Sequence, residues 1–470
     1  MKAIYSSVFL FVHLASTQTL EKVGDVFPIQ LRSNGVSDIQ GTDSPLGKTY
    51  VLTHPGATYI ALHFSQLKLR KGDSIEVSDA EGGQAYTLTG SGRGNGAAFW
   101  SQHIKGDTIV LNTVIQSRFF WRRKSVFVID KYAAGFEALT ETICGRDNKE
   151  NAMCYASSFP EEYNKSRAVA RLLINGSGLC TGFLVSESGH LLTNRHCIES
   201  ASDALNTDYE FMSEAPTCDS PNSQLAYKGT IYSGATLISY SSSLDFALVQ
   251  INNGNPASLF GYLELDDQLA AVGGQIYIPQ YPYGWAKQLA IYSSLTVDEI
   301  DGFCHINKRG TFDSCSSGSN IDLFYYCDTE GGSSGSPIIS RATNKVVGLH
   351  KCGGCSSGNH ATSAHLIRNR IVPTISPPPA PVPVAPPVET PTTPTAPSPV
   401  PLPVETPTTP TAPMPAEPTA PTVTETPPAP APVEAPPVPA PTPVCLRRRS
   451  RCSSHSRCCS GFCRSSGRCR

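Results

Sequence analysis

The sequence predicts an all-β protein, and three local patterns carry that prediction. From about residue 20 to 137, apolar side chains recur at every second position in short runs separated by turns rich in Gly and Asp. Such regularly spaced short strands are typical of an antiparallel β-sandwich. Further along, Asn175-Gly176 separates apolar runs at 169–174 and 181–185, which predicts a β-hairpin, and residues 190–193 resemble a strand paired with the second run. The alternating positions in the first stretch are Ile60, Leu62, Phe64, Ile75, Val77, Ile109, Leu111, Val126 and Val128.

The chain has 470 residues, more than one hydrophobic core normally uses, so several independent parts are expected. Lys2, an apolar run at 8–14 and small residues at 15–17 are typical of a secretory signal. The run is far shorter than the ~20 residues that a membrane span needs, so we expect a secreted, extracellular protein without a transmembrane anchor. The predicted parts are a signal peptide at 1–18, a β-rich prosegment or N-terminal domain at 19–137, a chemistry-bearing domain at 138–372, a linker at 373–444 and a small cysteine-rich module at 445–470.

Cysteine usage agrees with export. Ten of the sixteen cysteines lie between 144 and 355, and six lie in the last 26 residues. Both counts are even, and disulfides persist in oxidising compartments, so disulfides are expected rather than free thiols. Cys352-Gly-Gly-Cys355 has no matching second pair, so no zinc site and no cofactor is predicted. With a net charge of −2, nothing in the balance of charges suggests nucleic acid as the main partner, and none is expected.

The C-terminal region changes composition abruptly. Residues 373–444 hold 29 of the 39 prolines, which predicts an extended spacer that builds no core. The cysteine spacing of 445–470 resembles the inhibitor cystine-knot (knottin) scaffold. That resemblance implies the pairs Cys445–Cys459, Cys452–Cys463 and Cys458–Cys469, while spacing alone leaves fifteen pairings open. The module carries eight arginines and no acid, so we expect it to bind an anionic polysaccharide or cell surface.

Residues that suit nucleophilic catalysis occur between 180 and 340. A serine hydroxyl needs a base, an acid that holds the base, and amide donors for the oxyanion. Ser334 lies in a Gly- and Ser-rich segment at 330–337, where the amides of Gly332 and Ser334 would form the oxyanion hole. His196 follows an apolar strand, and Asp245 precedes another. Taken singly, the Gly/Ser cluster could be an ordinary loop and Asp245 a turn cap.

Three motifs taken together resemble trypsin-like serine peptidases: Thr-Asn-x-His-Cys at 193–197, Leu-Asp-Phe-Ala-Leu at 244–248 and Gly-Gly-Ser-Ser-Gly-Ser-Pro at 331–337. In particular the chain resembles bacterial glutamyl and lysyl endopeptidases over 138–372. The resemblance implies two six-stranded antiparallel β-barrels of the chymotrypsin type and protein or peptide substrates. It also implies an N-terminal prosegment, a role that 19–137 could fill. The implied disulfides are Cys180–Cys197, Cys154–Cys218 and Cys144 with Cys355 or Cys352. How the remainder of Cys304, Cys315, Cys327 and Cys352 pair is left open.

Two features depart from the trypsin pattern. Ser333 stands where trypsin has the aspartate that receives a freed N-terminus, so the usual zymogen switch is not expected. The specificity pocket is polar, but its charge preference stays open. Asp328 stands where trypsin binds Lys or Arg, while Thr329 and His350 match residues that bind acidic side chains in glutamyl endopeptidases. We favour the basic preference, because a buried carboxylate without a partner would seek a cation.

The sequons at Asn164 and Asn175 predict glycosylation, the second at an exposed hairpin tip. The leading functional hypothesis is a secreted serine endopeptidase. The alternative is an inactive protease homologue that acts as a binding or inhibitor protein, although no member of the Ser-His-Asp set is missing. A further alternative makes 19–137 a permanent carbohydrate- or protein-binding domain instead of a prosegment.

Overall fold

The computed structural model describes residues 20–34, 36–116, 125–136, 143, 146–294, 302–310, 322–354 and 358–375, and all structural statements refer to them. Several predictions lie outside this part of the chain. They are the signal peptide, nearly all of the Pro-rich linker, the C-terminal module with its three disulfides, and any disulfide that uses Cys144, Cys315 or Cys355.

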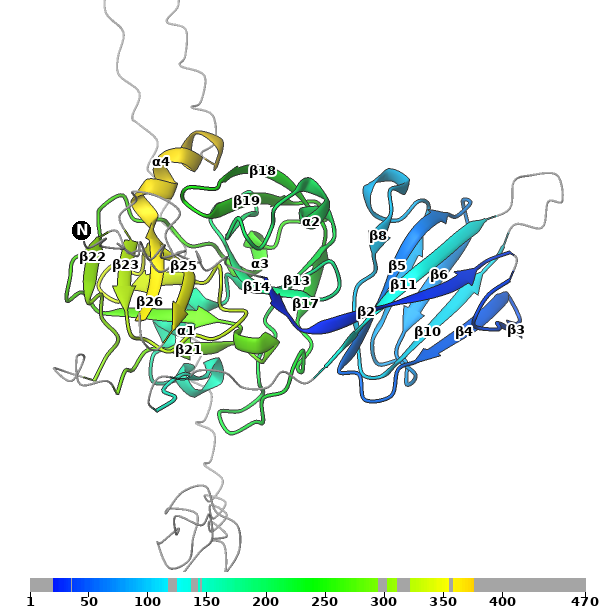
Figure 1. Cartoon of the computed structure of the whole chain (residues 1–470), viewed down its shortest axis with the longest axis horizontal. Coiled ribbons are helices and arrows are strands. Elements are labelled where there is room, and N and C mark those ends of the chain that lie inside the picture. The colour runs from blue at the N-terminus through cyan, green and yellow to red at the C-terminus, as the bar shows by residue number, and fades with distance from the viewer. Residues whose placement is uncertain are drawn as a thin grey trace, which may run out of the picture. The chain divides into compact units, whose positions relative to one another are not determined.

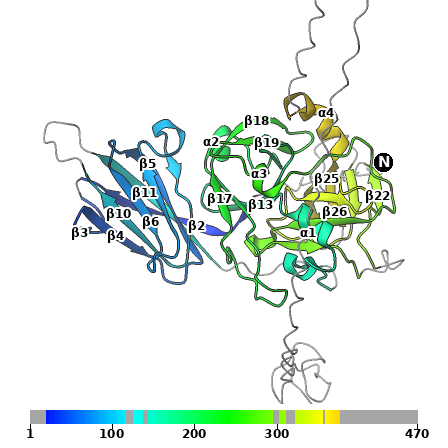
Figure 2. The ribbon, with the colours of Figure 1, turned by 180° about the vertical axis from the view of Figure 1, so that it is seen from behind.

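Residues 24–135 form two facing antiparallel sheets with one apolar core between them (Figures 1 and 2). The seven-residue strand β10 alternates strictly between buried and half-buried positions, the period of two that a sandwich requires. One sheet has the order β3 (Thr42–Ser44), β4 (Gly47–Thr53), β10 (Thr108–Val114), β6 (Ser74–Ser78) and β7 (Ala85–Thr89). The other has β2 (Gly24–Arg32), β11 (Val126–Gly135), β5 (Tyr59–Lys68) and β8 (Phe99–Trp100), with β9 (Ile104–Lys105) also paired to β5.

One strand of the sandwich has the opposite orientation from that predicted. Val126 and Val128 were expected to face the core, but Phe127 and Ile129 are buried and the two valines are half-buried. All four residues are apolar, so alternation alone cannot choose the inner face of this strand. The pair that adds the larger apolar area, Phe127 and Ile129, lies inside.

Residues 150–363 form two further antiparallel sheets, drawn from green to yellow in Figure 1, which confirms the predicted all-β, double-barrel class. The first sheet has the order β17 (Thr230–Ser233), β16 (Thr207–Phe211), β13 (Val169–Ile174), β14 (Gly178–Leu184), β15 (His190–Thr193), β19 (Phe246–Ile251) and β18 (Ala235–Ser241). The second has β12 (Glu150–Asn151), β21 (Gln288–Ala290), β20 (Ile276–Gln280), β24 (Pro337–Ser340), β25 (Val346–Gly354), β26 (Gly358–Ser363), β23 (Asp322–Tyr325) and β22 (Lys308–Gly310).

The local strand predictions hold in this region. β13 and β14 pair from Val169↔Phe183 to Ile174↔Gly178, so Asn175-Gly176 is the predicted hairpin turn. Asn175 and Gly176 both have positive φ, which the Asn-Gly pair tolerates well. β14 and β15 also pair, as predicted. A strand outside this region, β1 (Glu21–Lys22), adds to the β14 edge of the first sheet.

Helices are short in the described residues. They are α1 (Pro160–Ser166), α2 (Ala201–Leu205), α3 (Ala257–Phe260) and α4 (Ala364–Ile375). Ser200 caps α2 and exchanges hydrogen bonds with Asp203 in a capping box. Among the residues described, no helix has the length and apolar character needed to cross a membrane.

Candidate active site

His196 and Asp245 meet at the ends of two paired strands. β15 and β19 are neighbours, and each residue lies in the loop that flanks its strand. The Nδ1 atom of His196 is 2.7 Å from Oδ2 of Asp245, and the backbone N–H of His196 donates to Oδ1 at 3.0 Å. Both carboxylate oxygens therefore bind the same residue, which fixes the ring orientation and directs Nε2 away from the carboxylate.

Asp245 is held in an unusual backbone conformation. Its φ is +45°, a region that L residues rarely adopt and that costs about 1–2 kcal/mol. The buried side chain of Asn194 donates from Nδ2 to the carbonyl of Asp245 at 2.9 Å. Because Asn194 lies two residues before His196, one short segment holds both His196 and the backbone of Asp245.

Ser334 lies in the loop between β23 and β24, and the loop is tied to β14. The hydroxyl of Thr181 donates to the carbonyl of Gly332 at 2.9 Å, and the backbone N–H of Thr181 donates to the carbonyl of Ser334 at 2.8 Å. Gly332 has a φ of +89°, and a Cβ there would lie 2.5 Å from Leu179. Gly335 has a φ of +88°, and a Cβ there would lie 2.1 Å from the carbonyl oxygen of Thr181. Only glycine suits these two positions.

Alternate amides of this loop are left without an internal acceptor. The N–H of Ser333 donates to Glu330 and the N–H of Gly335 donates to His350. No backbone acceptor is found for the N–H groups of Gly332 and Ser334 among the described residues. These are the two amides assigned to the oxyanion hole from the sequence, and they are free to bind a developing negative charge.

A disulfide between the His196 segment and β14 lies next to the loop that contains Ser334. Cys197 is bonded to Cys180 in β14, and Cys197 Sγ lies 4.0 Å from the carbonyl oxygen of Ser334. Ser334 itself is half-buried. In the described structure no hydrogen bond joins the Ser334 hydroxyl to His196, so the Ser–His contact is not closed in this state. In peptidases without substrate this contact is often long.

The three residues predicted to line the specificity pocket differ in how accessible their polar groups are. Asp328 is 7% exposed, and its Oδ2 accepts a hydrogen bond of 2.7 Å from the backbone N–H of Asn148. Burial raises the pKa of Asp328 to about 6, although the Asn148 bond lowers it. His350 is 3% exposed, and its Nδ1 is 2.6 Å from the hydroxyl of Tyr325. Burial lowers the pKa of His350 to about 3, so the ring is neutral near pH 7. Thr329 is half-buried.

Several residues that support the loop were not identified from the sequence. Lys149 Nζ is 2.6 Å from the Glu330 carboxylate, and both side chains are fully buried. The hydroxyl of Ser333 donates to Oε1 of buried Gln280 at 2.6 Å. For Gln280, the sequence offered only its apolar neighbours as a sign that the side chain is buried. For the ion pair it offered no sign, because Lys149 and Glu330 are 181 residues apart in the sequence. Ser333, at the position where trypsin has an aspartate, therefore makes a hydrogen bond between two neutral side chains.

The structure also pairs cysteines. Cys180–Cys197 and Cys154–Cys218 are the pairs that the resemblance implies, and Cys304–Cys327 is a pair that sequence reasoning left open. Two groups have metal-ligand residue types close together: Cys180, His196 and Cys197, and Glu150, Cys154 and Cys218. In each group the two cysteines are joined to each other, so neither supplies a thiolate.

The two sequons differ in exposure. Asn164 is exposed on α1. Asn175 is half-buried and donates from Nδ2 to Asp203 at 2.8 Å, and Gly176 packs against Trp100. The expectation of an exposed hairpin tip at Asn175 is therefore wrong. The reason is that the sandwich covers this turn, which the local sequence does not reveal.

Comparison with known proteins gives a family match to part of the chain. Residues 146–365 match the family described as lysyl endopeptidase, C-terminal domain. Two solved structures are similar in fold. A Glu endopeptidase in complex with MPD has a TM-score of 0.34 and 17% identity, covering 49% of this chain and 97% of its own. The active form of a protease from M. tuberculosis has a TM-score of 0.34 and 16% identity, covering 50% and 92%.

Two curated relatives extend the comparison. Uncharacterized protein y4fB of Sinorhizobium fredii (strain NBRC 101917 / NGR234) is 31% identical over 203 residues, which cover 40% of this chain and 28% of that protein. Secreted RxLR effector protein 73 of Plasmopara viticola is 34% identical over 339 residues, which cover 68% of this chain and 80% of that protein. Identity of this level over most of both sequences shows common descent, and the chain belongs to the family of Secreted RxLR effector protein 73, with a protease-type double barrel at 146–365.

Proposed function

We propose that this protein is a secreted serine endopeptidase that hydrolyses peptide bonds through His196, Asp245 and Ser334. The observation that carries the proposal is the pairing of His196 with both carboxylate oxygens of Asp245, beside a loop whose Gly332 and Ser334 amides lack internal acceptors. The match to a lysyl endopeptidase domain supports the same reaction class.

In the proposed reaction, Ser334 Oγ attacks the substrate carbonyl while His196 Nε2 takes the hydroxyl proton. Asp245 holds the ring through Nδ1 and stabilises the imidazolium that forms. The amides of Gly332 and Ser334 bind the oxyanion of the tetrahedral intermediate. His196 then gives the proton to the leaving amine, which leaves an acyl group on Ser334. A water molecule, deprotonated by His196, hydrolyses that ester and releases the serine.

We further propose that Asp328 selects a Lys or Arg side chain before the cut. Asp328 is buried and accepts a backbone hydrogen bond from Asn148, and burial outweighs the nearby Lys149 in setting its raised pKa. Such a carboxylate suits a substrate cation. The neutral, buried ring of His350, already bound to Tyr325, argues against capture of an acidic side chain. The Asp328→Asn variant should lose roughly 10- to 150-fold in kcat/KM for peptides with Lys before the cut, which corresponds to a charge-assisted hydrogen bond of about 1.5–3 kcal/mol.

The pKa of Asp328 also predicts a pH effect. Because that pKa is raised to about 6, the carboxylate is neutral below pH 6 and charged above it. The ratio of kcat/KM for a Lys peptide to that for a matched norleucine peptide should therefore fall as pH decreases through 6. Taking the ratio removes the titration of the catalytic base. Ser258→Ala, at an exposed position of α3, is the control, and a pH-independent ratio or a preference for Glu would contradict the assignment.

The C-terminal tether stays a proposal that rests on composition. The Arg-rich module at 445–470 should hold the protease on an acidic polysaccharide or cell surface. A chain that ends at Ile375 should keep its activity on short peptides but no longer bind an alginate matrix at low salt. The full chain should be released near 1 M salt, where charges are screened within ~3 Å. Equal retention of both proteins at low salt would refute the tether.

A further inference from the structure

We propose that the N-terminal segment Leu20–Lys22 is an intramolecular inhibitory strand, which occupies a peptide-binding edge of β14 beside Ser334 and competes there with substrate. The proposal rests on the peptidase function proposed above. It concerns regulation of that same site, and it names the occupant of the edge as this chain's own N-terminal segment.

The segment binds β14 as an added strand. β1 pairs antiparallel with β14, with Glu21 opposite Leu179 and Lys22 opposite Gly178. The next residue, Val23, donates its N–H to the carbonyl of Ser177 at 2.8 Å. On its other side this part of β14 pairs with β13, and β15 pairs only with the distant end of β14. The edge at 178–179 is therefore available to an extended peptide, and β1 occupies it.

The edge of β14 that β1 occupies also holds the loop that contains Ser334. Thr181, two residues beyond Leu179, donates to the carbonyls of both Gly332 and Ser334. Leu179 itself contacts Gly332, because a Cβ at that glycine would lie 2.5 Å from its side chain. A peptide bound along 178–179 therefore lies next to the loop that carries Ser334.

The side chains of the segment reach the same loop. A Cβ on Gly178 would lie 2.2 Å from Leu20, so Leu20 packs directly on this edge. A Cβ on Gly331 would lie 2.5 Å from a carboxylate oxygen of Glu21. Glu21 thus places a negative charge against the residue that precedes Gly332. That charge opposes the formation of an oxyanion at the neighbouring amides, in addition to filling space.

An apolar interface holds the segment in place. Tyr59, in β5 of the sandwich, donates its hydroxyl to the carbonyl of Gly176 at 2.8 Å. One buried apolar cluster joins the sandwich to the barrels; its members are Val23, Tyr59, Ala61, Trp100 and Ala133 on one side and Leu173, Leu179 and Leu225 on the other. Val23 belongs to this cluster and follows β1 directly, so the strand is fixed at its C-terminal end.

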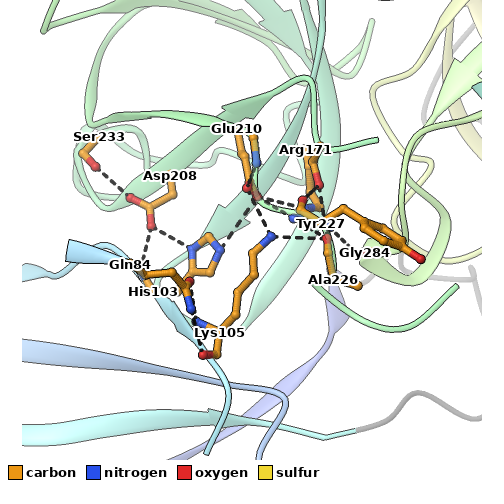
Figure 3. Close-up of polar contacts among 12 residues, drawn as sticks. Gln84, His103, Lys105, Arg171, Asp208, Glu210, Ala226, Tyr227, Ser233 and Gly284 are labelled. Carbon is orange, nitrogen blue, oxygen red and sulfur yellow. Dashed lines mark hydrogen bonds and ion pairs between the residues drawn. The ribbon is translucent and has the colours of Figure 1, made fainter. Parts of the chain in front are cut away.

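A buried group of charges strengthens the same interface (Figure 3). Figure 3 shows the ring of His103 between two carboxylates of β16, with Nδ1 3.1 Å from Asp208 and Nε2 3.7 Å from Glu210. Arg93 is 2.7 Å from Asp208, and Lys105 is 3.4 Å from Glu210. The bases come from the sandwich and the acids from the barrel. The interface therefore presents Leu20–Lys22 to β14 at high effective concentration, and a substrate must displace it.

The test compares Glu21→Pro, which removes a backbone donor from the strand, with Val36→Pro at an exposed turn of the sandwich as control. Using the full-length secreted chain, we would measure hydrolysis of a short Lys peptide and the rate of labelling of Ser334 by a fluorophosphonate. Glu21→Pro should lower KM and raise the labelling rate, each by about tenfold, because the strand loses the Glu21 N–H donor and the proline ring disturbs its pairing with Leu179. The control and kcat should be unchanged.

A second measurement adds the segment as a separate peptide, and its effect on the wild-type chain does not depend on the folding of any variant. A synthetic peptide with the sequence of residues 18–25 should inhibit Glu21→Pro competitively and should inhibit the wild-type chain less. Equal KM, equal labelling and no inhibition by the peptide, in a chain that labels and cleaves, would refute the inhibitory strand while leaving the peptidase intact. Absence of labelling and cleavage in every variant would instead refute the peptidase function on which the proposal rests.

Discussion

Replacing Ser334 by alanine is expected to abolish peptide hydrolysis, with a loss on the order of 10⁶ in kcat. The same loss is expected for His196→Ala, and the double variant should be no worse, because the two residues act as one unit. Asp245→Asn should cost about 10⁴, since an amide next to His196 Nδ1 favours the wrong tautomer. Initial rates on a fluorogenic peptide would measure all four proteins.

Folding of these variants must be shown to be intact. The Ser334 hydroxyl makes no hydrogen bond within the described structure, so its removal should leave the thermal midpoint unchanged. Ser258→Ala, in an exposed part of α3, is the matched control and should keep full activity. Substantial hydrolysis by Ser334→Ala would exclude this nucleophile, and a wild-type chain with no hydrolysis of any peptide would favour the inactive homologue.

Replacing Glu210 by alanine is expected to cost about 3–5 kcal/mol in the free energy of unfolding, the usual cost of breaking a buried ion pair. Glu210 Oε2 accepts from Arg171 Nε at 3.1 Å and from Arg171 Nη2 at 2.5 Å, and Arg171 is 1% exposed. Lys105 binds the same carboxylate. The variant leaves the buried Arg171 guanidinium without its anion and removes an acceptor of the half-buried Lys105 amine, which is far more costly than losing a surface charge.

The charge state of Glu210 supports this expectation. Burial alone would raise its pKa, but the charges of Arg171 and Lys105 outweigh burial and hold the pKa well below its usual range. A depressed pKa means that the stabilisation is present above the unfolded-state value of about 4.3 and is lost only in stronger acid. Urea unfolding at pH 7 measures the effect. Glu76→Ala, at an exposed position of β6, is the control. An equal change in the free energy of unfolding for both variants would show that the buried ion pair of Glu210 does not stabilise the fold.

The sequence revealed the candidate catalytic residues because each lies in a contiguous motif beside a strand that alternation or apolar runs predict. His196 follows β15, Asp245 precedes β19 and Ser334 precedes β24, so local sequence also indicated where each residue stands in the fold. The Asn175-Gly176 turn was predictable for the same reason, because the type of hairpin turn depends on two adjacent residues.

Long-range contacts were not predictable in this way. The pairing of Glu21 with Leu179 joins residues 158 positions apart. A strand of two residues is too short for its sequence to indicate which strand it pairs with. The Lys149–Glu330 pair is equally non-local. The Cys304–Cys327 disulfide spans only 23 positions, but spacing did not select it among the cysteines left open. In β11 the limit was different, because Val-Phe-Val-Ile is apolar on both faces and only packing selects the inner one.

Covalent labelling followed by peptide mapping would show whether Ser334 is an activated nucleophile. The purified full-length chain would be treated with a fluorophosphonate, digested and analysed by mass spectrometry, with His196→Ala treated in parallel. We expect one modified residue, Ser334, in the wild-type chain and little or no modification when His196 is replaced by alanine. Modification of another serine, or equal modification of Ser334 with and without His196, would contradict this expectation.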